Sequence, residues 1–181
     1  MKRILIVILL CIGGTLFAQA QEKISYSEVI KVDSTKAENI FVTIKEWLSM
    51  EFEKGNNAVE LQDKEAGLIV INASSSYKYS KGGLSYTWAN GCVEYKINIQ
   101  IRDNRFKVTI TNFVHKGATG SDHLGVLTTA EEPDVKWGKK NYTNVWKDLK
   151  VQVEKMAQVW FLAFKTIDFK NFDKDTSEDD W

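Results

Sequence analysis

Four aromatic side chains around a glycine pair are the residues in this sequence best suited to contacting a ligand or a partner. Tyr77, Tyr79, Tyr86 and Trp88 lie on the two sides of Lys81-Gly82-Gly83. Aromatic rings that carry polar groups often anchor protein and glycan partners when they are exposed. The same rings would serve as core residues if they packed under a C-terminal helix. The sequence leaves both interpretations open, and the four residues form the candidate binding site.

The residue types that bind metal ions are concentrated in one polar stretch. They are His115, Asp122, His123, Glu131, Glu132 and Asp134. Their spacing matches no recognised zinc or calcium motif. We therefore expect a solvated polar loop here and no metal site.

The sequence lacks the common signatures of catalysis. It has no Gly-x-Ser-x-Gly elbow and no phosphate-binding glycine loop, and Cys92 has no histidine close to it in the sequence. A single cysteine at the start of a strand is typical of a small packed apolar residue. We therefore predict no catalytic residues, no cofactor and no enzymatic activity.

The first 20 residues have the pattern of a secretory signal peptide. Lys2-Arg3 precede the apolar run Ile4 to Phe17, and Ala18-Gln19-Ala20 fit a cleavage site. The apolar run is too short to span a bilayer comfortably. A lipid anchor at Cys11 is the alternative, but Leu10 stands where lipoprotein signals have a small residue. We expect a periplasmic or secreted protein with no integral membrane segment after cleavage.

Composition fits one globular domain and argues against a nucleic-acid partner. The chain has 181 residues, of which 44% are hydrophobic and 27% are charged. Cleavage would leave 22 basic and 24 acidic residues, a net charge of about −2, whereas nucleic-acid binding favours a basic chain. We predict a single α+β domain over residues 21–167. An acidic tail over 168–181 is expected to be disordered.

Two strands, Cys92 to Arg102 and Arg105 to Val114, form the predicted centre of the fold. Apolar and polar residues alternate along both, which indicates one buried face and one wet face. Asp103-Asn104 favours a tight hairpin turn. The hairpin would place Ile101 opposite Phe106, and it would also pair Ile99 with Val108 and Ile97 with Ile110.

Two helices are predicted from apolar residues that recur every three or four positions. The first runs to about Glu53, and Thr35 with Glu38 fits a capping box at its start. The second begins near Asn141 and extends an apolar stripe to Ile167.

The remaining strands are shorter. Ile24 to Val32 is a first strand, Ala58 to Gln62 has Val59 and Leu61 facing inward, and Leu68 to Ala73 follows. Lys81-Gly82-Gly83 is compatible with a second hairpin turn.

The phase of the pattern changes between the aromatic stretch and the central hairpin. Tyr86 and Trp88 have the opposite parity to Val93, so we place a β-bulge at Asn90-Gly91 if the strand is continuous. Residues 115–140 are expected to form a long loop.

The resulting order is β-α-β-β-β-β-α, with one antiparallel sheet and two helices packed on one face. The sequence resembles a family of exported bacterial domains of unknown function with a TBP-like fold. The resemblance rests on Thr35-Lys36-Ala37-Glu38-Asn39-Ile40-Phe41 with Trp47-Leu48, on Gly67-Leu68-Ile69, and on the stretch from Tyr95 to Phe106. It implies a fold and no functional residues.

The function expected from these observations is a non-catalytic binding or interaction module of the bacterial cell envelope, with a protein or glycan partner. The alternative is a carrier that holds an apolar small molecule between the sheet and the C-terminal helix. A carrier requires a cavity, whereas large inward residues such as Trp146 and Trp160 would fill that space.

Overall fold

The computed structural model describes residues 21–52, 58–81, 83–118, 123–135 and 139–169. The predicted signal peptide and most of the predicted acidic tail lie outside these residues. The elements in chain order are β1 (Ser25–Lys31), α1 (Ala37–Phe52), β2 (Ala58–Asp63), β3 (Leu68–Tyr77), the 3₁₀ helix η1 (Gly83–Ala89), β4 (Gly91–Arg102), β5 (Arg105–Gly117), β6 (Gly125–Val126) and α2 (Lys139–Lys165).

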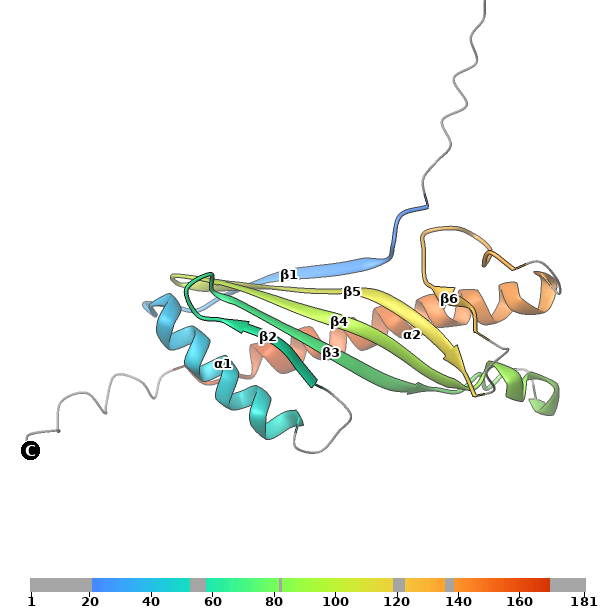
Figure 1. Cartoon of the computed structure of the whole chain (residues 1–181), viewed down its shortest axis with the longest axis horizontal. Coiled ribbons are helices and arrows are strands. Elements are labelled where there is room, and N and C mark those ends of the chain that lie inside the picture. Colours follow the sequence, from blue (N-terminus) through green and yellow to red (C-terminus); the bar gives the residue numbers. More distant parts are fainter. Residues whose placement is uncertain (1–20, 53–57, 82, 119–122, 136–138, 170–181) are drawn as a thin grey trace, which may run out of the picture.

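All strands belong to one antiparallel sheet, as the sequence predicts. The strand order is β1-β5-β4-β3-β2, and β6 pairs with β5 beyond the end of β1 (Figure 1). The short strand β6 and the helix η1 are additions to the predicted order. The α+β class and the single sheet are confirmed.

The central hairpin has the predicted register. Ile101 pairs with Phe106, Ile99 with Val108, and Ile97 with Ile110, and all these side chains are buried. Asn104 adopts a φ of 62° in the turn, a backbone conformation that asparagine tolerates better than most residues. The alternation of the sequence therefore determines which face of the sheet is covered.

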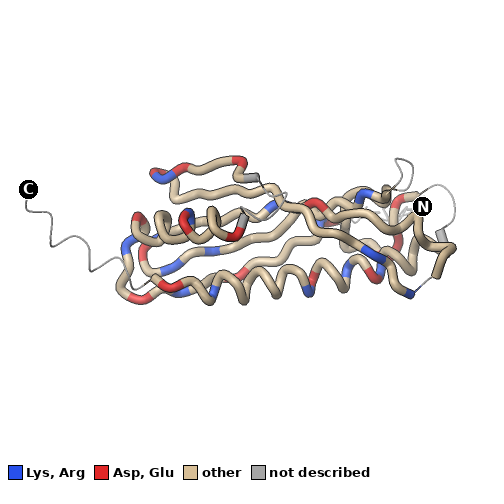
Figure 2. The backbone as a smooth tube through the Cα atoms, turned by 90° about the horizontal axis from the view of Figure 1, so that it is seen from below, with Lys and Arg blue, Asp and Glu red and all other residues tan. Residues whose placement is uncertain are grey.

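Both helices cover the apolar face of the sheet. Apolar side chains of α1 and α2 join those of the strands in one core, and α2 runs along the length of the sheet (Figure 2). The helices meet where the rings of Trp47 and Phe164 lie 5.1 Å apart. Trp146, Phe106 and Phe113 are fully buried between the layers. Among the described residues, no element covers the opposite face of the sheet, which we call the open face.

The start of α1 is capped from the central hairpin, not by the predicted capping box. Asp103 Oδ1 accepts a hydrogen bond from the Ala37 amide at 2.8 Å, and Asn104 Oδ1 accepts one from the Thr35 amide at 3.0 Å. Glu38 pairs instead with the lysine of the β2–β3 turn. The backbone amides at the start of α1 are therefore satisfied by acceptors that are distant in the sequence, and not by the local motif.

The prediction that Val59 and Leu61 both face inward is wrong for Leu61, and neither side chain is buried. The two side chains are 40% and 46% exposed. The register of β2 shifts between them, so that Val59 pairs with Ile71 but Leu61 pairs with Val70. A bulge adds one residue and turns the following side chain to the other face, and an edge strand has no outer neighbour to bury it.

The bulge that we place at Asn90-Gly91 for a continuous strand does not apply, because η1 ends at Ala89 and β4 begins at Gly91. The register between β4 and β5 shifts between Glu94 and Lys96, opposite Asn112, which has a φ of 57°. Gly91 has a different role, because a Cβ there would lie 2.0 Å from the Lys116 carbonyl oxygen. Glycine is required at this position for close approach of the two strands.

The segment predicted as a long loop is tied to the fold in its described parts. The strand β5 continues through His115 to Gly117, and β6 pairs with it. Further along, the indole nitrogen of Trp146 donates to the Ala130 carbonyl at 2.9 Å. These contacts hold much of the segment against the sheet and α2.

Candidate functional site

The four predicted aromatic residues lie together at one end of the sheet. Tyr77 is the last residue of β3 and Tyr79 follows it, and both are buried in the core. Tyr86 and Trp88 lie in η1 and are half-buried. The structure therefore unites the predicted set, but only Tyr86 and Trp88 reach the surface.

The predicted hairpin at Lys81-Gly82-Gly83 does not match the described residues. The chain forms the 3₁₀ helix η1 from Gly83 onward, and Gly82 lies outside the described residues. Tyr86 and Trp88 therefore follow helical geometry and not the period of a strand. This explains why their parity disagrees with that of β4.

A chain of ring contacts fixes η1 against the N-terminal part of α2. The ring centroids of Tyr79 and Tyr86 are 5.1 Å apart, and those of Tyr86 and Trp88 are 6.1 Å apart. Trp88 then packs edge-to-face on Tyr142 of α2 at 4.6 Å. Such aromatic pairs each contribute about 0.5–1.5 kcal/mol beyond their buried area. The rings hold the exposed side of η1 in place.

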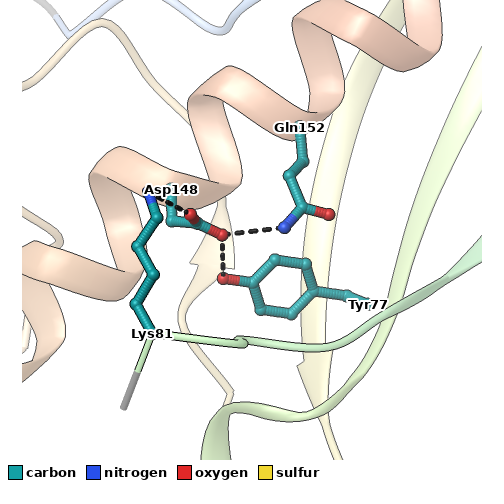
Figure 3. A network of polar contacts seen from close by, with 4 residues as sticks. All are labelled: Tyr77, Lys81, Asp148 and Gln152. Carbon is teal, nitrogen blue, oxygen red and sulfur yellow. Dashed lines mark hydrogen bonds and ion pairs between the residues drawn. The ribbon is translucent and has the colours of Figure 1, made fainter.

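The Tyr77 hydroxyl belongs to a polar network with α2 (Figure 3). It donates to Asp148 Oδ2 at 3.1 Å, and Gln152 Nε2 donates to the same oxygen at 2.8 Å. Lys81 Nζ lies 3.0 Å from Asp148 Oδ1. Burial, followed by the negative charge of Asp148, raises the pKa of the Tyr77 phenol far above its usual range. Tyr77 is thus a protonated donor that links β3 to α2.

His115 is fully buried beneath η1 and joins two segments of backbone. Its Nε2 lies 2.9 Å from the Ala89 carbonyl oxygen, and its Nδ1 accepts from the Leu124 amide at 3.3 Å. Burial lowers the pKa of the imidazole. These partners assign a neutral ring with its proton on Nε2.

The other residues of the predicted polar stretch do not gather around His115. His123 is exposed, and its Nδ1 accepts from the Gly117 amide at 3.0 Å. Among the described residues, no group of three or more His, Cys, Asp or Glu side chains could hold a metal ion. Asp122 lies outside the described residues. His115 therefore has a structural role in supporting η1.

Leu84 is the most prominent surface residue at this end of the sheet, and the sequence reasoning missed it. Its side chain is 91% exposed at the start of η1. Leu84, Tyr79, Tyr86, Trp88 and Tyr142 together form what we call the aromatic tip. One signal in the sequence could have indicated that Leu84 is exposed. It is a single leucine directly after a glycine pair, outside any alternating apolar pattern that would place it in the core.

Backbone hydrogen bonds make the aromatic tip rigid. Asn90 accepts from the Tyr79 amide through Oδ1 at 3.1 Å and from the Ala118 amide through its carbonyl at 2.6 Å. The Asn90 amide donates to the Thr87 carbonyl at 3.1 Å. The tip thus presents an apolar side chain and half-buried rings on a fixed backbone. Such an arrangement is suited to binding and contains no paired nucleophile and base.

The space that a carrier would need between the sheet and α2 is filled by side chains in the described structure. Trp146, Phe113 and Phe164 are fully buried between the sheet and α2. The Trp160 indole donates to the Tyr95 hydroxyl at 2.9 Å and so spans the two layers.

None of the helices in the described part of the chain is both long enough and apolar enough to cross a membrane.

Comparison with known proteins identifies relatives of the fold. The family described as a domain of unknown function (DUF4468) with TBP-like fold matches residues 26–116. A TBP-like protein from Parabacteroides distasonis has a similar structure, with a TM-score of 0.54 and 19% identity over 81% of this chain and 95% of that one. A DUF4468 family protein from Bacteroides ovatus has a TM-score of 0.54 and 14% identity over 78% of this chain and 86% of that one. No curated protein matches the sequence.

Proposed function

This chain belongs to the DUF4468 family of domains of unknown function with a TBP-like fold, and we propose that it is a non-catalytic binding module of the bacterial cell envelope. Because the family has no assigned function, the proposal is argued from the surface of this chain. The module is exported by means of residues 1–20 and contacts a protein partner through the aromatic tip. The signal-like pattern of Lys2-Arg3, the apolar run and Ala18-Gln19-Ala20 supports export.

The observation that carries the proposal is the exposure of Leu84 on a rigid support. Full burial of a leucine side chain is worth about 1.5–3 kcal/mol, so a partner that covers Leu84 gains that energy. The rings of Tyr86 and Trp88 and the hydrogen bonds of Asn90 already fix η1. Little conformational entropy is then lost on binding, which favours affinity.

A protein partner fits the tip better than the two alternatives. An apolar side chain next to half-buried tyrosine and tryptophan rings resembles the centre of a protein interface, where aromatic residues are enriched. A glycan partner would use the same rings but would gain little from Leu84. The carrier function is disfavoured because Trp146 and Phe113 occupy the space it needs.

The test compares two exposed leucines. Leu84→Asp changes the tip, and Leu162→Asp is the matched control, because Leu162 is 62% exposed on α2. Tagged full-length protein is expressed in its own host, and copurified material is quantified by mass spectrometry. We expect both variants to melt like the parent, since exposed substitutions cost within about 0.5 kcal/mol.

The proposed function requires that a protein copurify with the parent and with Leu162→Asp but not with Leu84→Asp. Retention of the same proteins by both variants would refute the tip as the contact surface. If a glycan copurifies instead of a protein, and if Tyr86→Ala loses it while Leu84→Asp retains it, the partner is a glycan and the proposed protein partner is refuted. We choose Leu84 because Trp88→Ala would also break the contact with Tyr142 and destabilise the fold.

A further inference from the structure

The open face of the sheet contains a basic groove at the end opposite the aromatic tip. The groove has a volume of about 610 Å³ and is lined by residues of β1, β3, β4 and β5, among them Val29, Leu68, Gln100, Arg102, Arg105 and Lys107. Its two margins, Val29 of β1 and Leu68 of β3, are apolar. The basic side chains lie between them, on both strands of the central hairpin.

Like charges face one another across the strands around this groove. Arg105 pairs with Arg102 on one side and with Lys31 on the other. Like charges directly opposite each other destabilise a sheet. Within the described residues, neither these side chains nor that of Lys107 forms an ion pair.

Other lysines on the same face have carboxylate partners. Lys96 Nζ lies 2.7 Å from Glu60 Oε2, and Lys116 Nζ lies 2.6 Å from Glu94 Oε1. Near the groove, Asp103 is turned toward α1, where it caps the helix. Glu65, in the turn between β2 and β3, is exposed. The unbalanced positive charge is therefore local to the groove and calls for an anionic occupant.

The sequence supplies such an occupant immediately after the last described residue. Residues 170–181 read KNFDKDTSEDDW and contain five acidic and two basic residues. The acidic residues are Asp173, Asp175, Glu178, Asp179 and Asp180. Trp181 adds an aromatic side chain that complements either apolar margin, Val29 of β1 or Leu68 of β3.

The end of the described chain lies close enough for this contact. The ring of Phe169 is 5.8 Å from that of Phe106, which lies in β5 between Arg105 and Lys107 and faces the helices. Asp173 follows four residues later, and four residues span up to roughly 13 Å when extended. The twelve residues after Phe169 span up to roughly 40 Å, which is sufficient to pass the hairpin turn and reach the open face.

We propose that the acidic segment 173–181 binds the basic groove of its own chain. The connection to Phe169 gives the segment a millimolar effective concentration at the groove, which an untethered ligand would have to match. The segment neutralises Arg102, Arg105 and Lys107 and shields the open face from other anionic partners. This contact is independent of the aromatic tip, so that either proposal can fail without the other.

The test uses the full mature chain with a neutralised segment, Asp175→Asn, Glu178→Gln, Asp179→Asn and Asp180→Asn. Nuclear magnetic resonance follows the backbone amides of the groove strands and the arginine Nε–H groups. We expect these signals to shift on neutralisation, whereas the amides of η1 do not move. Salt at about 1 M should produce the same shifts in the parent, because the Debye length is then about 3 Å.

A second arm adds a synthetic peptide of residues 170–181 to the neutralised chain. The peptide should restore the parent shifts, and Arg105→Gln should weaken its binding about tenfold, since it removes one charge-assisted contact. Lys155→Gln, an exposed lysine on α2, is the control with the same change of charge and should have no effect.

Three outcomes would overturn the proposal. The first is the absence of shifts at the groove on neutralisation. The second is equal weakening by Arg105→Gln and Lys155→Gln. The third is a groove shift that disappears on tenfold dilution of the parent, because the segment would then occupy the groove of a second copy.

Discussion

Removal of the Asp148 carboxylate is the sharpest test of how β3 is attached to α2. Asp148→Ala leaves the buried Tyr77 hydroxyl without its acceptor, which costs about 1–3 kcal/mol. Loss of the pair with Lys81 adds at most about 1 kcal/mol, because the lysine side chain is 71% exposed. We therefore expect a loss of about 1–4 kcal/mol in the free energy of unfolding.

The assay is urea unfolding of the parent, the two single variants and the double variant. Tyr77→Phe alone should cost about 1 kcal/mol, because Asp148 retains its contacts with Gln152 and Lys81. In the Tyr77→Phe background, Asp148→Ala should cost clearly less than in the parent, since no hydroxyl is then left unpaired. Strict additivity of the two single losses would refute the role assigned to this hydrogen bond.

Three further predictions address export, the core and pH. The mature protein should begin at Gln21 without lipid, and an intact mass corresponding to a lipidated Cys11 would contradict the predicted signal peptide. Ile99→Ala should cost about 2–5 kcal/mol through lost burial and a cavity, while Asn98→Ala on the open face should cost within about 0.5 kcal/mol in the same denaturant melts. Because burial lowers the pKa of His115 in the folded state, stability should fall as the pH drops below about 6.5, the pKa of an unfolded histidine. His115→Gln should flatten that decline, and an unchanged pH profile of unfolding would show that His115 does not cause it.

The central hairpin and the helices could be predicted because their signals are local. The alternation from Val93 to Ile101 specifies which side chains enter the core, and a shift by one residue would expose all of them. The stripe from Val145 to Phe164 predicts α2 in the same way. Periodicity, together with the Asp103-Asn104 turn, thus predicted the central hairpin, its register and the two helices.

The bulges and the helix cap could not be predicted, because they depend on partners far away in the sequence. Asp103 lies 66 residues from the amide that it caps, and no local sequence motif predicts that contact. The bulge opposite Asn112 similarly depends on how β5 pairs with β4. The reading of Thr35 and Glu38 as a capping box was chemically reasonable, but the hairpin turn provides the acceptors.

The sequence pointed to part of the aromatic tip but not to its exposure. Tyr79, Tyr86 and Trp88 are in ring contact because η1 folds the chain back, whereas Tyr77 contacts His115 and Asp148. Sequence parity could not show that the two residues nearest β3 would be buried, because a 3₁₀ helix replaces the expected strand. The contribution of Leu84 became visible only once that helix placed it outside the core.

The cap that the central hairpin provides for α1 also constrains the order of folding. The helix can gain its acceptor from Asp103 only after the turn between β4 and β5 has formed. Loop closure over such a separation is entropically costly, so the contact should be made late, after the hairpin has nucleated. Asp103→Ala should then accelerate unfolding more than it slows folding, because the contribution of Asp103 to the turn is present in the transition state whereas its contact with α1 is not.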